Sequence, residues 1–413
     1  MKVLMFGWEF PPHNAGGLGV ACKGLSEALS SAGIELVFAL PKRMEVSAPW
    51  CRIVFADKTY KGFDKTLYAQ GFYSPYRTDP SSLHKYAGVT EEWNTLGPSL
   101  FDEVRRYAFF AGTLALEESF DVIHAHDWLS IPAGLEAKRI SGKPLIVHIH
   151  ATEFDRAHAD RVNEEVYAIE RAGVRGADHI IAVSNYTKRI LIDRYGASPE
   201  KITVVHNGIN MDEWLVIPSY DTVLRAHREA GGKVVLFVGR ITLQKGPDYF
   251  IGMAKRVLEY EPNTLFVISG SGDMERQIIE HAAWLKIGSH VLFAGFLRGE
   301  ELRRMYMSAD VLVMPSVSEP FGIVPLESIA HGTPVIISKQ SGVSEVLKSA
   351  LKVDFWDTEE MANKLISALR HDALRATLAT EGLTEVQSIT WHKAAHTCID
   401  LYHRLTRLFN PAS

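Results

Sequence analysis

Short runs of consecutive apolar residues alternate with longer stretches of helical periodicity along most of this chain. A run that is apolar on both faces is typical of a strand in a parallel sheet that helices cover on both sides. Strands that alternate with helices in this way indicate parallel βαβ units, so the sequence predicts an α/β fold. The predicted strands span residues 3–6, 34–40, 122–126, 145–150, 179–183, 202–205, 234–238, 265–269, 290–293, 311–314 and 334–337.

These strands fall into two sets, which predicts two doubly wound, Rossmann-like domains. The chain has 413 residues, enough for two domains of the usual size of about 100–200 residues. We place the boundary so that residues 1–215 form an N-terminal domain and residues 216–389 a C-terminal domain. The last helix, within residues 390–413, follows a complete second sheet and is expected to pack back on the first domain. Residues 60–98 contain few aliphatic runs, and we interpret them as an insertion near the mouth of the cleft.

Composition and charge exclude several functional classes. The formal net charge is -5 and the basic residues are scattered, which argues against a broad nucleic-acid-binding surface. No apolar run approaches the length of about 20 residues that a membrane-spanning helix needs, although peripheral contact with a membrane stays open. Three distant cysteines, Cys22, Cys51 and Cys398, form neither a metal motif nor a disulfide framework. We therefore expect a protein of the reducing cytoplasm.

A glycine-rich turn follows the first predicted strand, at the end of a sheet where α/β proteins bind ligands. It contains Gly16, Gly17, Leu18 and Gly19 and opens a predicted helix over residues 18–31. Glycines let the backbone approach a ligand closely, and the free N–H groups of a helix start suit an anion such as a diphosphate. The turn lacks the G-x-G-x-x-G dinucleotide fingerprint. The alternative interpretation is a tight turn between strand and helix.

Two polar clusters end neighbouring predicted strands in the first half of the chain. His124 and His126 lie on the same face of their strand because successive side chains alternate. Asp127 follows them, and it either caps a helix that begins at the next residue or faces a ligand. No third ligand for a metal is evident beside these histidines. His150 ends the next strand, where it is either a structural histidine or part of a site.

A basic pair follows the first strand of the second half. Arg240 and Lys245 lie five residues apart, between Gly239 and Gly246. A guanidinium and an ammonium group on one loop suit a diphosphate leaving group. The loop is not a P-loop, since G-x-x-x-x-G-K-[ST] is absent. The alternative is a solvated surface loop.

Two glutamates follow a later strand of the second half. Glu319 lies in the loop after residues 311–314, and Glu327 follows eight residues later, about two turns along a helix if that helix begins near Gly322. Carboxylates are strong acceptors for paired sugar hydroxyls. We expect the two side chains to address different parts of one long ligand, since the apolar residues around Glu327 do not fit an exposed pair.

Together these motifs resemble the retaining glycosyltransferases of the GT-B fold, in particular the glycogen and starch synthase group and its sucrose-synthase-like relatives. The strongest match is Glu319-Pro320-Phe321-Gly322 with Glu327 and a His331-Gly332-Thr333-Pro334 tail. The basic loop 239–246, the opening segment 8–19 and the His-Asp-Trp sequence also match. The resemblance covers residues 2 to about 400, and it implies two Rossmann-like domains that face a central cleft.

The resemblance implies roles in binding a nucleotide-sugar donor. Arg240 and Lys245 would neutralise the departing diphosphate, Glu319 would bind hydroxyls of the transferred sugar, and Glu327 would hold the ribose. His150 would lie beside the reacting sugar carbon, and Asp127 near the sugar or the acceptor. The remaining donor contacts would come from backbone and loop groups of Gly16, Gly17, Leu18, Pro320, Phe321, Gly322, Ile323 and Val324.

The resemblance also implies a mechanism without a metal or another cofactor. Relatives keep the anomeric configuration by front-face attack in which the leaving phosphate takes the acceptor proton, so no carboxylate pair flanks the anomeric carbon as it does in a hydrolase. Arginine and lysine supply the charge that Mg²⁺ otherwise gives. The sequence contains no Asp-x-Asp, and we expect a metal-independent hexosyltransferase.

Two departures from the synthase pattern bear on the substrates. Synthases carry a lysine before the Gly-Gly-Leu turn, where this chain has Asn14-Ala15, and a cysteine after Glu-Pro, where it has Phe321. The lead hypothesis is transfer of glucose from ADP- or UDP-glucose to an α-glucan or a related acceptor. The alternative is a glycosyltransferase for a cell-envelope polysaccharide or glycolipid that uses a UDP- or GDP-sugar.

Two other classes fit the sequence less well. A non-catalytic sugar-binding regulator would be expected to lose Glu319, His150 or the basic pair, and all are present. A nicotinamide oxidoreductase would carry the missing dinucleotide fingerprint. Because donor and acceptor must meet between two domains, we expect hinges near residues 209–218 and before the last helix.

Overall fold

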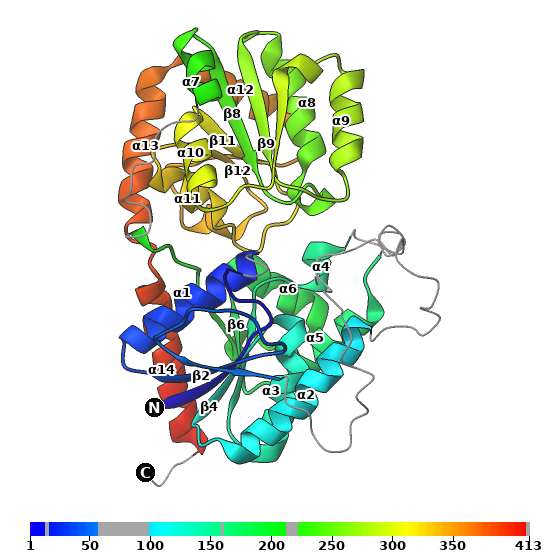
Figure 1. Cartoon of the computed structure of the whole chain (residues 1–413), viewed down its shortest axis with the longest axis vertical. Helices are drawn as coiled ribbons and strands as arrows, with labels where there is room; N and C mark the ends of the chain where they lie inside the picture. Colours follow the sequence, from blue (N-terminus) through cyan, green and yellow to red (C-terminus); the bar gives the residue numbers. More distant parts are fainter. Residues whose placement is uncertain (13–15, 57–98, 158–160, 212–221, 410–413) are drawn as a thin grey trace.

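The computed structural model describes residues 1–12, 16–56, 99–157, 161–211 and 222–409. Two layered α/β domains follow one another along the long axis of the molecule (Figure 1). Each contains one parallel sheet with helices on both faces, which confirms the predicted fold class. Within these ranges no helix combines the length and the apolar composition that crossing a bilayer requires. The insertion proposed at 60–98 lies outside the described residues.

The N-terminal sheet has seven parallel strands in the order β3-β2-β1-β4-β5-β6-β7. Six of them were predicted to within one or two residues. We did not predict β3, a four-residue edge strand that begins with an exposed arginine and contains no fully buried residue. The strands are β1 Lys2–Phe6, β2 Glu35–Leu40, β3 Arg52–Phe55, β4 Val122–His126, β5 Leu145–Ile149, β6 His179–Ala182 and β7 Ile202–Val204. The helices are α1 Gly17–Ser31, α2 Leu100–Glu117, α3 Asp127–Ser141, α4 Glu153–Arg156, α5 Glu164–Gly176 and α6 Asn185–Tyr195, with the 3-10 turn η3 Pro199–Lys201.

The C-terminal sheet has six parallel strands in the order β10-β9-β8-β11-β12-β13. The sequence missed β13, a three-residue strand at the sheet edge. The strands are β8 Lys233–Val238, β9 Thr264–Ser269, β10 Val291–Gly295, β11 Val311–Met314, β12 Val335–Ser338 and β13 Leu351–Val353. The helices are α7 Thr222–Glu229, α8 Pro247–Leu258, α9 Glu275–Trp284, α10 Gly299–Ser308, α11 Val324–Ala330, α12 Thr358–Arg370 and α13 Asp372–Val386, with the 3-10 turns η5 Leu243–Lys245, η6 Gly288–His290 and η7 Gly342–Glu345.

Each sheet separates two apolar cores, which explains why its strands are apolar at consecutive positions. In β1, Leu4 and Phe6 face the core beneath α2 and α3, whereas Val3 and Met5 face the core beneath α1. The strand is therefore buried on both sides, as parallel strands usually are. Its carboxyl end is the place where the chain leaves the core and polar side chains become possible.

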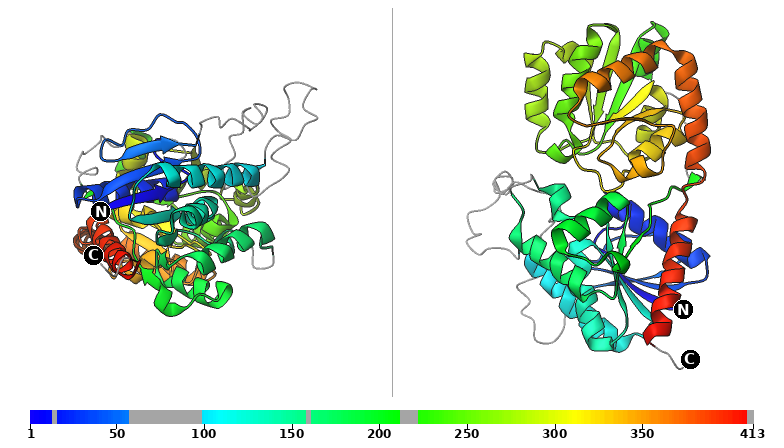
Figure 2. Two further views of the ribbon diagram at one scale, coloured as in Figure 1. Left: turned by 90° about the horizontal axis from the view of Figure 1, so that it is seen from below. Right: turned by 180° about the vertical axis from the view of Figure 1, so that it is seen from behind.

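The last helix, α14 Trp391–Phe409, packs on the N-terminal domain although it follows the second sheet (Figure 2). The chain thus crosses between the domains twice, and the crossings lie side by side: Ile209 N–H donates to the Ile389 carbonyl at 3.0 Å. Gly208 is required there, because a Cβ would lie 2.2 Å from the backbone nitrogen of Trp391. This double crossing is where we predicted hinges; the domain boundary and the hinge motion stay predictions, since residues 212–221 lie outside the described ranges.

Candidate active site

The basic loop of the C-terminal domain follows β8 and is shaped by a close backbone approach. Gly246 has φ +65°, and a Cβ there would lie 2.2 Å from the Pro315 carbonyl oxygen, so only glycine fits. This turn places the side chain of Lys245, in η5, over the carboxyl end of the sheet. Lys245 Nζ forms an ion pair with the Glu319 carboxylate. Arg240 Nη2 donates to Gln244 Oε1 at 3.1 Å.

Glu319 is fixed by its own backbone. Its N–H donates to the Gln340 carbonyl at 3.0 Å, and its carbonyl accepts from Gly342 N–H at 2.9 Å. The side chain is 10% exposed and also accepts a long hydrogen bond of 3.4 Å from Ser316 Oγ. The structure thus brings together the two groups expected to bind the sugar hydroxyls and the diphosphate. A donor placed between them would replace their mutual contact.

Glu327 lies nearer the helix start than predicted. The helix α11 begins at Val324 and not near Gly322, so Glu327 is in its first turn and the expectation of two turns was wrong. The cause is Gly322, whose φ of +98° is incompatible with a helix. The buried Tyr306 hydroxyl donates to Glu327 Oε2 at 2.7 Å. Sequence reasoning missed Tyr306, because it comes from a different helix, α10, with no motif that links the two.

The loop between these glutamates is held by packing and hydrogen bonds within the protein. The Phe321 side chain is buried in the C-terminal core, and its carbonyl accepts from Val343 N–H at 2.7 Å. The Pro320 carbonyl accepts from Ser184 Oγ of the N-terminal domain at 2.6 Å. The donor contacts assigned to Pro320, Phe321, Gly322, Ile323 and Val324 stay predictions.

The glycine turn of the N-terminal domain leaves a helix start open. Gly16 precedes α1 without any side-chain cap, and the first turn of α1 contains no acidic residue. Gly17 is exposed, and among the described residues nothing beyond its chain neighbours lies within 4 Å of where its Cβ would be. An uncapped helix start with a positive dipole end is what a phosphate-binding turn needs, and phosphate binding here stays a prediction.

Four histidines stack across the ends of β4 and β5. His124 Nε2 lies 3.2 Å from His148 Nδ1, and His126 Nδ1 lies 2.9 Å from His150 Nε2. The hydroxyl of Tyr402, from α14, lies 2.6 Å from His124 Nδ1. Burial lowers the pKa of His124 and of His150 to about 3, so these imidazoles are neutral near pH 7.

The stack also contains the third histidine that the sequence did not reveal as a metal ligand. One ring nitrogen from each of His124, His126 and His148 lies within 4.8 Å of the others. The interplanar angle is 19° between His124 and His126, 18° between His124 and His148, and 34° between His126 and His148. The predicted metal independence stays a prediction.

Asp127 does not cap its helix as one interpretation proposed. It is itself the first residue of α3, with φ +58°. Its Oδ1 accepts the N–H groups of His150 at 2.6 Å and of Ala151 at 3.3 Å. Burial raises the pKa of Asp127 to about 7, while the charge of Arg156 lowers it. Asp127 thus holds the backbone at His150 in place; direct contact with a substrate stays a prediction.

Loops of the two domains form hydrogen bonds with each other. Ser318 donates to Asp155 Oδ1 at 2.6 Å across the interface, and Tyr186 OH lies 3.0 Å from Ser318 Oγ. Glu345 accepts the N–H groups at the start of α6, from Asn185 at 2.9 Å and from Tyr186 at 2.8 Å. Sequence reasoning missed all of these residues, because each needs a partner from the other domain.

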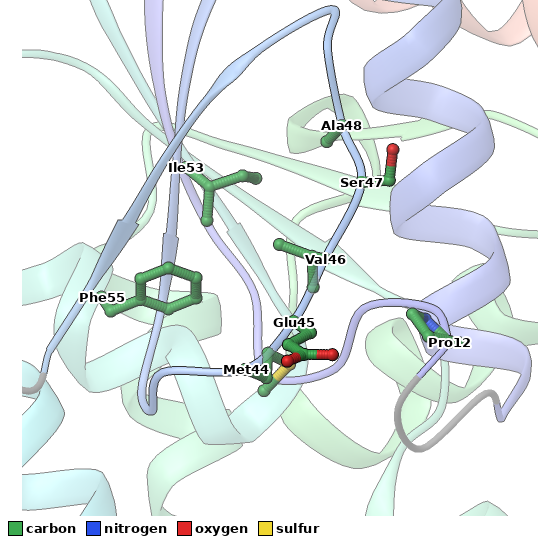
Figure 3. Close-up of a pocket in the computed structure, with 8 residues that line it drawn as sticks. All are labelled: Pro12, Met44, Glu45, Val46, Ser47, Ala48, Ile53 and Phe55. Atoms are coloured by element: carbon green, nitrogen blue, oxygen red, sulfur yellow. The ribbon is translucent and has the colours of Figure 1, made fainter.

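A separate groove runs along the β3 edge of the N-terminal domain (Figure 3). It has a volume of about 560 Å³. Its walls are mostly apolar, with Pro12 of the glycine-turn segment at one end. None of the predicted site residues lines it. The residues around the groove are Pro12, Met44, Glu45, Val46, Ser47, Ala48, Ile53 and Phe55.

Comparisons with known proteins address the family to which the chain belongs. Residues 223–384 match the family described as glycosyl transferases group 1, and residues 15–213 match glycosyltransferase family 4. An uncharacterized glycosyltransferase of Methanocaldococcus jannaschii is 33% identical over 84% of this chain and 83% of its own length. A glycogen synthase of Mycobacterium tuberculosis is 29% identical over 84% of this chain and 80% of its own length.

A solved structure shares the whole architecture. Sucrose-phosphate synthase from Thermosynechococcus elongatus superposes with a TM-score of 0.76 at 22% identity, covering 99% of this chain and 100% of that one. At this identity the likeness shows the fold alone. Together with the two family matches, it identifies the chain as a member of the glycosyltransferase family with a GT-B fold.

Proposed function

We propose that this glycosyltransferase transfers glucose from ADP- or UDP-glucose to an α-glucan or a related acceptor. The observation that carries the proposal is the ion pair of Lys245 with Glu319, because a cation suited to phosphate is in contact with a carboxylate suited to sugar hydroxyls. The carboxylate of Glu327, which accepts a hydrogen bond from Tyr306, would bind the ribose. The similarity to a glycogen synthase supports glucose and a glucan acceptor.

The proposed reaction keeps the anomeric configuration. The bond from the anomeric carbon to the donor phosphate oxygen breaks while the acceptor oxygen bonds to the same face of that carbon. The acceptor proton passes to the leaving phosphate, whose charge Arg240 and Lys245 neutralise without a metal. The neutral imidazole of His150, which burial prevents from protonating, is suited to a hydrogen bond with a sugar hydroxyl.

The proposal also covers the cellular context. The three cysteines are free thiols, two of them buried, which favours the reducing cytoplasm. Peripheral contact with a membrane belongs to the alternative function, a cell-envelope glycosyltransferase that uses a UDP- or GDP-sugar.

A donor and acceptor screen tests the proposal. ADP-, UDP- and GDP-sugars are incubated with the protein, with and without maltooligosaccharide or glycogen, and nucleoside diphosphate release is measured. We expect release from ADP- or UDP-glucose that rises when the glucan is added, and an α-linked product by NMR. Turnover of a GDP-sugar alone, or a β-linked product, would contradict the proposal.

A further inference from the structure

Glu9 lies at the carboxyl end of β1, where the chain leaves both cores. Its neighbours turn to opposite faces of the sheet: Trp8 packs edge-on against Tyr107 at 6.0 Å, and Phe10 against Phe38 at 5.2 Å. They belong to the two separate N-terminal cores. The side chain of Glu9 therefore lies between these cores, at the sheet edge where ligands bind in such folds.

The Glu9 carboxyl group is buried without a hydrogen-bond partner. The residue is 1% exposed, and neither carboxyl oxygen has a partner among the described residues. Native proteins satisfy nearly all buried polar groups, because an unmade hydrogen bond costs free energy. A buried carboxyl that is left unsatisfied in the ligand-free protein points to a ligand that completes it.

Charges from both domains lie close to this carboxyl. Burial raises the pKa of Glu9 to about 8; the charge of Asp127 raises it further, and that of Arg240, from the C-terminal domain, lowers it. Glu9 is thus within electrostatic reach of Asp127, which holds the backbone at His150, and of Arg240 in the predicted diphosphate site. A carboxyl that is largely protonated near pH 7 offers one O–H donor and an acceptor oxygen.

We propose that Glu9 binds hydroxyls of the incoming acceptor sugar and is the acceptor-selecting residue on the N-terminal wall of the site. The argument rests on the proposed function, since it takes the donor groups to be bound by Arg240, Lys245, Glu319 and Glu327. A protonated carboxyl brings no positive charge to a diphosphate, but its O–H donor and its acceptor oxygen suit a pair of hydroxyls. Because the hydroxyls of the donor are assigned to Glu319 and Glu327, the hydroxyl-bearing substrate that remains for Glu9 is the acceptor.

The test measures the KM of the enzyme for maltotetraose as the acceptor. Glu9→Ala is expected to raise the KM for maltotetraose about tenfold or more, as the loss of a pair of hydrogen bonds does. Glu9→Gln, which keeps a donor and an acceptor, should recover part of the loss. The affinity of each variant for ADP or UDP by calorimetry should stay within about twofold of wild type. Glu117→Ala, at the exposed C-terminal end of α2, is the control variant.

A stability measurement separates binding from a structural role. If the carboxyl serves a ligand, Glu9→Leu removes an unsatisfied buried group, and its Tm without ligand should equal or exceed that of wild type. A structural carboxyl would give a lower Tm. An unchanged KM for maltotetraose in Glu9→Ala, an equal loss of nucleotide affinity, or a lower Tm of Glu9→Leu would each overturn the inference.

The same experiments distinguish this inference from the proposed function. Direct binding of maltotetraose is followed by calorimetry in wild type and Glu9→Ala with UDP or ADP present. If no nucleotide sugar turns over but binding depends on Glu9, the proposed function fails and the inference stands. If transfer to maltotetraose occurs and Glu9 does not affect it, only the inference fails. Wild type that binds no maltotetraose overturns the inference as well.

Discussion

The two domains contribute opposite kinds of polar group to the candidate site. We call these groups the N-terminal wall and the C-terminal wall. The N-terminal wall carries neutral, fully buried imidazoles such as His124 and His126, each 0% exposed. The C-terminal wall carries the charged pair of Lys245 and Glu319, whose side chains are 20% and 10% exposed. The first wall is held by contacts within the protein, whereas on the second wall a donor bound as we propose would exchange one ion pair for its own contacts.

The difference follows from where each group sits in its sheet. The histidines end the central strands β4 and β5, and α14 covers them, so burial keeps them uncharged. Lys245 and Glu319 lie on loops beyond the strand ends, where solvent still reaches and charge persists. A fixed neutral wall suits the orientation of hydroxyls; a charged wall suits the neutralisation of a leaving diphosphate.

The largest effect is expected from removing a charged side chain of the C-terminal wall. Lys245→Ala and Glu319→Ala should each lower kcat/KM for the donor by about 10²–10³-fold while the protein stays folded, because each removes charge stabilisation of the transition state. Steady-state kinetics and circular dichroism check this. Lys255→Ala, an exposed lysine of α8, is the matched control and should behave as wild type. Near-normal transfer by either site variant would remove that residue from the mechanism.

Acid should destabilise the neutral N-terminal wall, and with it the folded protein. The pKa of His124 is lowered to about 3 in the folded protein, from an ordinary value of 6.5. Between these values the unfolded chain binds the extra proton, so stability is lost as pH falls from about 6.5 towards 3. We expect the free energy of unfolding in urea to fall by about 1–3 kcal/mol more between pH 6.5 and 4 in wild type than in His124→Asn. Equal pH slopes would contradict the neutral stack.

A smaller effect, on the donor KM, is expected from a change beside Glu327 in the C-terminal wall. Tyr306→Phe removes the hydroxyl that donates to Glu327 at 2.7 Å. Loss of one such bond of about 1 kcal/mol should raise the donor KM about fivefold and leave kcat nearly unchanged, because the ribose is held equally in ground and transition states. A large fall in kcat with an unchanged KM would show that Tyr306 acts elsewhere.

The smallest expected effect concerns metals. If Arg240 and Lys245 supply the charge that a metal otherwise gives, transfer after dialysis against EDTA should stay within about twofold of the untreated rate. Recovery of a lost activity by added Mg²⁺ or Mn²⁺ would contradict metal independence.

The sequence predicted what depends on neighbours along the chain. Strand positions followed from runs such as β11 Val311–Met314, found without error, because burial on both faces leaves a continuous apolar signal. The basic loop and the two glutamates were readable as motifs. The start of α11 was misplaced by two residues because the effect of Gly322 on the backbone depends on its φ, which the sequence does not state.

Residues that act through distant partners were not predictable. Asp127 was interpreted as a cap of the helix beside it, but its carboxylate bonds to a backbone 23 residues away. Tyr306 gave no local signal, since its role is defined by a contact with another helix. Glu9 lies in the opening segment 8–19 that matched as a motif, but the absence of a hydrogen-bond partner among the described residues could not be predicted from the sequence. Such roles arise from packing of sheets and domains, which one sequence does not specify by spacing.

Calorimetric titration with ADP and UDP tests the central claim most directly, namely that Lys245 and Glu319 exchange their ion pair for a nucleotide-sugar donor. The wild-type protein should bind one of the two nucleotides with one site per chain, and Lys245→Ala should bind it about tenfold more weakly or worse, since it loses a charge-assisted contact with the diphosphate. Absence of binding by wild type, or equal affinity in wild type and Lys245→Ala, would contradict the account.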